Sequence, residues 1–275
     1  MKQRLDLLLV EKKLAETRHQ AQALILAGRV KVNHSSALKP GDSVSDTSFI
    51  EVVEPFPYVG KGGIKLAKAL QVFQVNPKGK ICLDIGASTG GFTDCLLQNG
   101  AAKVYAVDVG KGQLSWKLRT DPRVVSLERT NARYLTAAEI PEAILLCVMD
   151  VSFISVQKIL PAARDLMLPH GEILVLIKPQ FEAERGAAKK GVIREKEIHE
   201  KVLHKMMEWL EVNAFFVQGI THSPVSGAEG NIEFLCHLSF EESREVFDLA
   251  WIVEKAHQEL KENQGRFPSS LEVKE

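Results

Sequence analysis

From residue 61 onward, the chain alternates short apolar runs with segments of helical periodicity. Strands that alternate with helices form βαβ units, and such units build a mostly parallel sheet that is buried on both faces. The sequence therefore predicts an α/β fold with a Rossmann-like sheet of seven strands. The seven apolar runs are Ile81–Ile85, Val104–Val107, Val124–Leu127, Ile144–Met149, Ile173–Ile177, Phe215–Ile220 and Ile232–Leu238.

A small α+β region precedes the alternating part. Residues 4–14 carry leucines at helical spacing, which predicts a helix. A second helix is predicted from Thr17, a good N-cap residue, to Gly28, a glycine of the kind that follows a helix. The other expected elements are a strand at Val30–Val32, a turn at 33–36 and one or two short strands within 42–53.

Two prolines mark the boundary between these parts. Pro55 and Pro57 interrupt regular structure, so the boundary is placed near residues 54–60. Helical spacing returns at Val246 and is followed by a polar stretch that we expect to fray. The predicted organisation is a small domain at 1–56, a linker at 57–62, a large domain at 63–245 and a C-terminal helix and tail at 246–275.

The charge of the chain is balanced overall but uneven along its length. The formal net charge is zero, with 45% hydrophobic and 25% charged residues, as in ordinary globular proteins. Residues 1–31 hold seven Lys or Arg against three acids. A basic head of this kind is typical of a module that faces a polyanion. On charge alone, an ordinary charged helix surface explains the excess better.

Cysteine usage and hydropathy limit the class of protein. The four cysteines are widely spaced among apolar residues, fit no zinc pattern and are expected to be buried, reduced thiols, so we expect no metal and a cytoplasmic protein. Lys2, Arg4 and Asp6 interrupt the N-terminal leucines, unlike a signal peptide. The longest apolar run, Ala143–Met149, is too short to span a bilayer, so we expect no membrane partner.

A glycine-rich turn joins the first apolar run of the large domain to a helix expected at Phe92–Gln98. Its spacing, G-x-x-x-G-G, differs from the G-x-G-x-x-G that seats a pyrophosphate. An acid two residues before the first glycine suits a cationic ligand without phosphate. S-adenosyl-L-methionine has such a cationic amino-acid end and a sulfonium. We therefore expect this cofactor at Asp84, Gly86, Ala87, Ser88, Gly90, Gly91 and Phe92.

Two further polar residues follow neighbouring strands. Asp108 ends the second strand, where a carboxylate can accept hydrogen bonds from a ribose diol. Asn131 follows the third strand, where its amide could recognise adenine. A single glycine-rich turn is weak evidence, because many such turns bind nothing. The turn, Asp108 and Asn131 in this order favour a nucleotide-like ligand.

Four charged residues form a candidate catalytic group. Asp150 and Lys178 each end an apolar strand, Glu233 lies within the run Asn231–Leu235, and Lys65 lies on the helix before the sheet. Ligands of open α/β sheets bind beyond the carboxyl ends of the strands, so Asp150 and Lys178 point to the crevice that Asp84 also faces. Taken singly, each charge could simply be solvated. Glu233, between two apolar residues, needs a partner if it points inward.

Two lysines and two acids in one cleft have a chemical use. A ribose hydroxyl becomes a good nucleophile only when its proton is removed. Lys178 could remove it once it has lost its own proton, which burial or the like charge of Lys65 favours. We assign Lys178 as the general base and Asp150 as the residue that holds it near the transferred methyl. Lys65 and Glu233 position the hydroxyl and tune the base.

These residues resemble those of a known family. The chain is similar over about residues 1–240 to the TlyA/hemolysin A-type rRNA 2′-O-methyltransferases, whose catalytic domain is similar to that of the FtsJ/RrmJ methyltransferases. The matching segments are Arg4–Asp6, Ala27–Val30, Val32–Asn33, Gly63–Leu66, Leu83–Thr93, Asp108–Gly110, Asp121–Arg123, Glu128–Asn131, Asp150–Ser155, Lys178–Glu182 and Gly230–Phe234.

The resemblance implies both a reaction and a substrate. It implies a Lys-Asp-Lys-Glu tetrad, which falls on Lys65, Asp150, Lys178 and Glu233, and a seven-stranded methyltransferase sheet. It also implies that the head is an S4-type RNA-binding domain and that the partner is ribosomal RNA or a ribosomal subunit, with a cytidine as the target. The head would then present basic side chains to phosphates. These are Arg4, Arg18, Arg29 and Lys31.

Two other hypotheses stay open at this stage. The family's second name raises the possibility of a haemolysin that acts on membranes, although the sequence has no strongly amphipathic basic helix to support it. A scaffold that binds RNA and keeps the cofactor fold without chemistry is the other alternative. The complete tetrad argues against the scaffold.

Overall fold

The computed structural model describes residues 2–33, 35–36, 39–52, 57–184, 186–188, 190–243 and 245–262. The chain divides into two compact units, Met1–Phe56 and Pro57–Glu275, and each is considered by itself. Pro55 and the polar tail expected after 262 lie outside the described residues.

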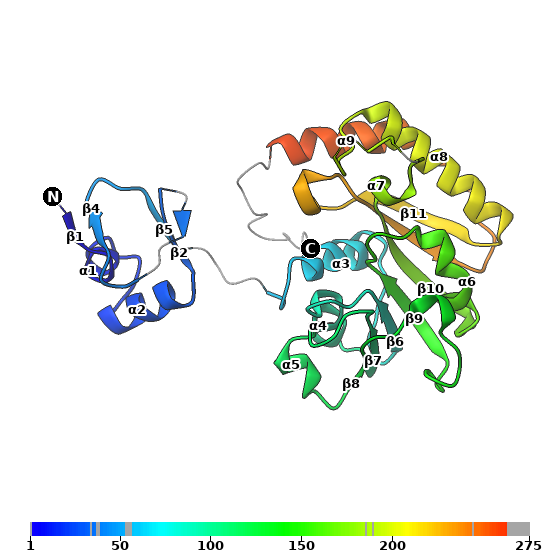
Figure 1. The fold of residues 1–275 in the computed structure, drawn as a ribbon, viewed down its shortest axis with the longest axis horizontal. Coiled ribbons are helices and arrows are strands. Elements are labelled where there is room, and N and C mark those ends of the chain that lie inside the picture. The colour runs from blue at the N-terminus through cyan, green and yellow to red at the C-terminus, as the bar shows by residue number, and fades with distance from the viewer. Residues whose placement is uncertain are drawn as a thin grey trace. The chain divides into compact units, whose positions relative to one another are not determined.

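The smaller unit packs two helices against short strands (Figure 1). Its core consists of apolar side chains from both helices, from the loop between them and from the central strand, Leu5, Leu9, Ala15, Ala21, Ile25 and Val30. Two antiparallel sheets flank them, β1 with β4 and β2 between β3 and β5. The elements are β1 Lys2–Arg4, α1 Leu5–Glu11, α2 Arg18–Leu26, β2 Val30–Val32, β3 Ser35–Ser36, β4 Ser43–Ser45 and β5 Ile50–Val52.

Capping residues at both ends explain the second helix of this unit. Two other expectations for the unit were wrong. The Thr17 hydroxyl accepts the N–H of Gln20 at 3.1 Å, and Gly28 has φ of 69°, so the predicted cap and terminal glycine are confirmed. The first helix is shorter than 4–14, because Arg4 pairs in β1 and the chain leaves the helix after Glu11. Part of the predicted turn at 33–36 pairs with β2 as a strand.

The larger unit contains the predicted seven-stranded sheet, in the order β11-β12-β10-β9-β6-β7-β8 (Figure 1). The five strands from β10 to β8 are parallel, and β12 runs against both β10 and β11. The α/β fold class is therefore confirmed. The strands are β6 Ile81–Ile85, β7 Lys103–Val107, β8 Val124–Leu127, β9 Ile144–Met149, β10 Met167–Ile177, β11 Phe216–His222 and β12 Phe234–Ser239.

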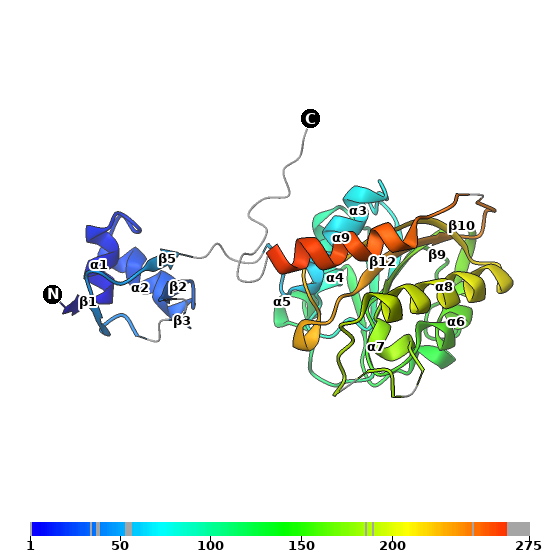
Figure 2. The ribbon, with the colours of Figure 1, turned by 90° about the horizontal axis from the view of Figure 1, so that it is seen from above.

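Helices cover both faces of this sheet (Figures 1 and 2). Alternate strand residues supply two separate cores: Cys82 packs with α3, α4 and α5, whereas Leu83 packs with α6, α8 and α9. The helices are α3 Gly62–Val72, α4 Gly91–Gln98, α5 Trp116–Arg119, α6 Leu160–Arg164, α7 Pro179–Glu182, α8 Lys196–Val212 and α9 Leu249–Glu262, with short turns η1 Ala132–Tyr134, η2 Val156–Lys158 and η3 Ala228–Gly230.

Some predicted bounds shift. Strand β10 begins six residues earlier than expected, and β12 begins at Phe234 instead of Ile232. The last helix begins at Leu249, and Val246 before it is 95% exposed. Over the described residues, no helix combines the length and the apolar character that crossing a membrane requires.

Candidate active site

The glycine-rich turn lies between β6 and α4, at the carboxyl edge of the parallel strands. Gly86 and Gly90 have φ of 87° and 99°, a backbone conformation that residues with a side chain rarely adopt. A Cβ on Gly86 would lie 2.4 Å from the carbonyl oxygen of Asp150, and one on Gly90 would lie 2.2 Å from Leu118. These glycines therefore let the turn pack closely against the loop after β9 and against α5.

The turn forms one wall of a polar hollow with a cavity volume of about 200 Å³. Its lining residues are Gly62, Gly86, Ala87, Ser88, Thr89, Gly91, Phe92, Asp150, Ser152 and Lys178. A smaller hollow shares Ala87 and Ser88 with the first and continues to Asp108. The two hollows adjoin at Ala87 and Ser88, and we refer to them together as the elongated site.

Asp84 does not line either hollow. Its side chain is fully buried beneath the turn, where Oδ2 accepts the Thr93 hydroxyl at 2.6 Å. Burial raises the pKa of Asp84 to about 7. Its Oδ1 has no hydrogen-bond partner among the described residues. The sequence had led us to expect Asp84 at the surface of the hollow. The structure places it behind the backbone of the turn instead.

Asp108 lies in the smaller hollow, whereas Asn131 lies apart from both. The two oxygens of Asp108 accept the backbone N–H groups of Ser88 at 2.8 Å and Gly110 at 2.7 Å, so this carboxylate holds the turn in place. Asn131 is exposed and caps η1 by accepting the N–H of Arg133. Glu128 and Gln113, which the sequence analysis did not single out, line the smaller hollow instead.

The four tetrad candidates come together from four elements. Lys65 on α3 donates to Glu233 at 2.5 Å and lies 4.0 Å from Asp150. Asp150, after β9, also lies 2.6 Å from Lys178, which directly follows β10. Asp150 therefore bridges the two lysines. Glu233 precedes β12 and is not inside a strand, contrary to expectation.

Burial makes these charges depend on one another. Both lysines and Glu233 are buried, and two lysines facing two carboxylates leave no net charge. Burial raises the pKa of Glu233, and the nearby Lys65 opposes that shift. Removing one member would leave an uncompensated buried charge.

Two side chains that the sequence did not point to hold the loop that carries Asp150. Ser152 accepts a hydrogen bond from Lys178 at 2.9 Å. Glu182 on α7 accepts the Ser155 hydroxyl at 2.6 Å and the N–H of Val156 at 2.8 Å. The sequence offered one indication of their role, because Ser152 follows Asp150 by two residues and Glu182 follows Lys178 by four. Spacing alone does not show that the two segments touch.

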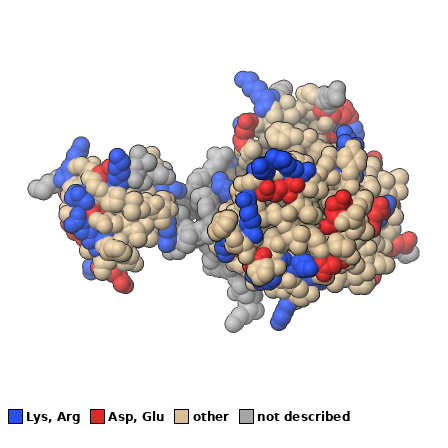
Figure 3. Space-filling model, turned by 60° about the horizontal axis from the view of Figure 1, so that its bottom comes forward, with Lys and Arg blue, Asp and Glu red and all other residues tan. Residues whose placement is uncertain are grey.

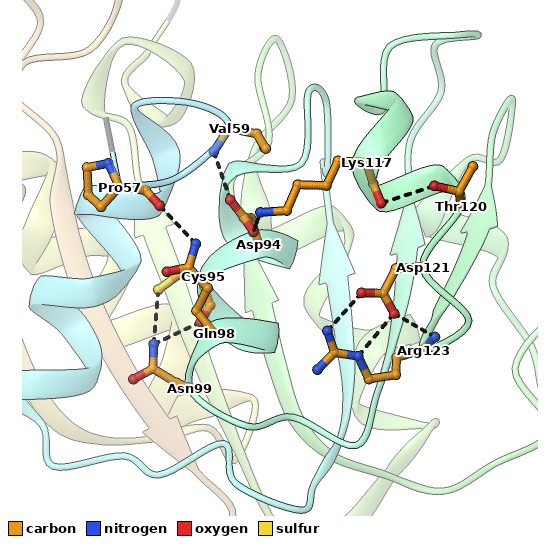
Figure 4. Close-up of polar contacts among 10 residues, drawn as sticks. All are labelled: Pro57, Val59, Asp94, Cys95, Gln98, Asn99, Lys117, Thr120, Asp121 and Arg123. Carbon is orange, nitrogen blue, oxygen red and sulfur yellow. Dashed lines mark hydrogen bonds and ion pairs between the residues drawn. The ribbon is translucent and has the colours of Figure 1, made fainter. Parts of the chain in front are cut away.

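The segment that enters the larger unit is tied to the helix after the turn (Figure 4). Asp94 on α4 accepts the N–H of Val59 at 2.9 Å and the ammonium of Lys117 at 3.1 Å. One turn further, the Gln98 amide donates to the carbonyl of Pro57 at 2.8 Å. These bonds hold residues 57–59 against α4 next to the hollow.

Two of the predicted basic contacts in the smaller unit lie together. Arg4 and Arg18 both bind the buried carboxylate of Asp6, and their side chains remain 48% and 54% exposed. The Arg4 guanidinium holds the pKa of Asp6 far below its usual range. Lys31 lies 3.8 Å from Glu51, and Arg29 is half-buried. Figure 3 shows basic side chains gathered on this unit and mixed charges on the larger one.

Comparison with known proteins gives the chain a family. A model of FtsJ-like methyltransferases matches residues 58–240, and a model of the S4 domain matches residues 3–50. The solved structure of a candidate hemolysin from Streptococcus thermophilus is 44% identical, covers 95% of this chain and 98% of its own, and superposes with a TM-score of 0.76.

Two relatives carry informative names. Hemolysin A of Brachyspira hyodysenteriae is 47% identical over 85% of this chain and 98% of its own length. The 16S/23S rRNA (cytidine-2′-O)-methyltransferase TlyA of Mycobacterium tuberculosis is 42% identical over 88% of this chain and 91% of its own. Sequence, fold and site agree in one conclusion: the chain is a methyltransferase of the TlyA/hemolysin A family, in which an S4 domain precedes an FtsJ-like catalytic domain.

Proposed function

We propose that this protein transfers a methyl group from S-adenosyl-L-methionine to the ribose 2′-hydroxyl of a cytidine in ribosomal RNA. The observation that carries the proposal is the Lys65–Glu233 and Asp150–Lys178 group, of which Asp150 and Lys178 line the hollow. The substrate class comes from the name of the mycobacterial relative. The S4 domain supports RNA as the partner.

The residues of the elongated site fit the cofactor. Asp108 has lone pairs left for a ribose diol, since each oxygen accepts one backbone N–H. The turn from Gly86 to Gly91 would hold the amino-acid end, with Phe92 behind it. Asp84, whose Oδ1 has no hydrogen-bond partner among the described residues, lies beneath this position. When bound, the cofactor supplies the activated methyl group.

The tetrad has the arrangement that proton removal from a hydroxyl requires. In the proposal, Lys178 takes the proton of the 2′-hydroxyl as general base. Asp150 holds Lys178 and attracts the cation that forms on it. Lys65 and Glu233, on the opposite side of Asp150, position the hydroxyl. Holding the hydroxyl and the base in a fixed geometry would by itself raise the rate of methyl transfer.

The smaller unit would bring the RNA to this site. Its basic side chains Arg4, Arg18, Arg29 and Lys31 would contact phosphates, which fix position without reading sequence. Asp6 orients Arg4 and Arg18 in advance, since both guanidiniums bind its carboxylate and stay half exposed.

A transfer assay tests the proposal. Purified protein is incubated with methyl-labelled cofactor and separated ribosomal subunits from cells that lack the gene, and the labelled nucleotide is mapped. The proposal predicts label on the 2′-oxygen of a cytidine in one or both subunits. Label on a base, or no label on either subunit, would contradict it.

A further inference from the structure

Among the described residues, the ammonium of Lys178 has one contact with hydrogen-bond geometry. Nζ donates a hydrogen bond to Ser152 Oγ at 2.9 Å. Asp150 Oδ1 lies closer, at 2.6 Å, but the pair lacks hydrogen-bond geometry, and this oxygen has no hydrogen-bond partner among the described residues. Asp150 therefore attracts the nitrogen without fixing its rotation about the Cε–Nζ bond. Ser152 fixes that rotation.

The loop that carries Ser152 is held against the segment that follows Lys178. Phe153 has φ of 64° and packs its ring 5.1 Å from that of Phe181. Beyond it, Glu182 binds both Ser155 and the backbone of Val156. These contacts fix the position of the loop after β9 relative to the segment after β10. They place the exposed Ser152 beside Lys178 in the lining of the hollow.

A neutral lysine nitrogen has three positions around its Cε–Nζ bond, two N–H groups and one lone pair. Ser152 Oγ accepts one N–H. The negative charge of Asp150 attracts the second N–H and repels the lone pair. The lone pair is then left at the third position. A base can take a proton only along its lone pair, so the direction of this third position decides whether Lys178 can act.

We propose that Ser152 is a positioning residue that orients the lone pair of Lys178 toward the ribose hydroxyl. The proposal rests on the proposed function, because it concerns the base of that reaction. Ser152 acts through Lys178 and need not touch the methyl donor. Its loss leaves Lys178 in place, still attracted by Asp150, but free to rotate.

Substitutions of Ser152 separate this role from a structural one. Ser152→Ala removes the acceptor, and Ser152→Thr keeps it at an exposed position that tolerates one more methyl group. We expect Ser152→Ala to lower kcat about tenfold, the effect of one lost hydrogen bond, with KM for RNA and the cofactor Kd unchanged. We expect Ser152→Thr to restore kcat to within about threefold of wild type. Ser239→Ala, which removes a hydroxyl bonded to Gln218 at the far end of β12, is the matched control.

The outcomes distinguish this inference from the proposed function. Wild-type transfer together with full-rate Ser152→Ala would overturn the inference alone. So would a loss in Ser152→Ala that Ser152→Thr does not restore, or a loss that appears in KM or in cofactor affinity. Absence of 2′-O transfer by the wild-type protein would overturn the proposed function, and this inference with it.

Discussion

Single residues in the site can hold the backbone in place and also line a hollow. Asp108 illustrates this best, because its two oxygens hold the backbone of Ser88 and Gly110 while it faces the smaller hollow. Asp84 shows the opposite case, a carboxylate fully buried beneath the turn. A carboxylate at a strand end can therefore face the ligand or the protein. Which one it faces is settled by the hydroxyl or N–H groups that surround it.

Substitution of Asp108 tests the cofactor end of the site. Asp108→Ala removes the acceptor of the expected ribose bonds and releases the turn, so we expect the Kd for S-adenosyl-L-methionine to rise at least about tenfold. Isothermal titration measures it. Asp121→Ala is a matched control, because Asp121 also accepts a backbone N–H, that of Arg123, outside the hollows (Figure 4). Equal affinity in the two variants would contradict the role given to Asp108.

At the scale of elements, the buried centre of the sheet was predictable from sequence. The bounds of the central strands β6 and β9 agree with the apolar runs, because strands covered on both faces read as short continuous apolar segments. The bounds of the edge strand β8 agree as well. The early part of β10 was not predictable. It contains Pro169 and Gly171, and its pairing with β9 is irregular between Met167 and Glu172. Such an extension is fixed by its neighbouring strand and not by its own composition.

The site was predictable where it depends on strand ends and not where it depends on loops. Asp150 and Lys178 follow neighbouring parallel strands, so their meeting at one edge followed from the fold. The contacts of Ser152 and Glu182 depend on the paths of two loops, which sequence periodicity does not describe. Asn131 was assigned to adenine from its position alone, and the structure uses its side chain as a cap.

The packing of α9 on α8 predicts an acid-sensitive stability. His199 Nδ1 lies 3.0 Å from His257 Nε2 in the core between these helices, and burial lowers the pKa of His199 to about 4. Unfolded histidine titrates near 6.5, so the unfolded chain binds a proton in this window that the folded chain does not. The contribution of His199 to the free energy of unfolding is then constant above about pH 6.5. It falls by up to about 1.4 kcal/mol per pH unit between about 6.5 and 4.

Urea unfolding at about pH 7.5 and about pH 5.5 measures this effect. We expect His199→Asn, which removes the titrating group, to lose less stability on acidification than the wild type. His204→Asn, an exposed position on the same helix, should behave as the wild type. An equal loss in all three proteins would show that His199 is not the group responsible.

In the whole molecule, we propose that the smaller unit binds the RNA and the larger unit transfers the methyl group. Arg4→Gln with Arg18→Gln removes two positive charges while each amide can still donate to Asp6. We expect weaker binding to rRNA and a salt slope smaller by roughly 1–2, with cofactor affinity unchanged. Filter binding across a salt series measures both. Arg164→Gln is the control, because Arg164 lies at the end of α6 and does not line the hollow. An equal change in this variant would count against an RNA contact by the smaller unit.

In the proposed reaction Lys178 removes the proton of a ribose hydroxyl, and single-turnover transfer to ribosomal RNA by Lys178→Ala measures this step. Lys80→Ala is the matched control, since Lys80 is a part-buried lysine in an ion pair with Glu172 before β6. The account predicts a loss of about 10²- to 10⁴-fold in the rate of 2′-O-methylation for Lys178→Ala, with cofactor binding intact and Lys80→Ala near wild type. Methylation by Lys178→Ala at the wild-type rate would contradict it.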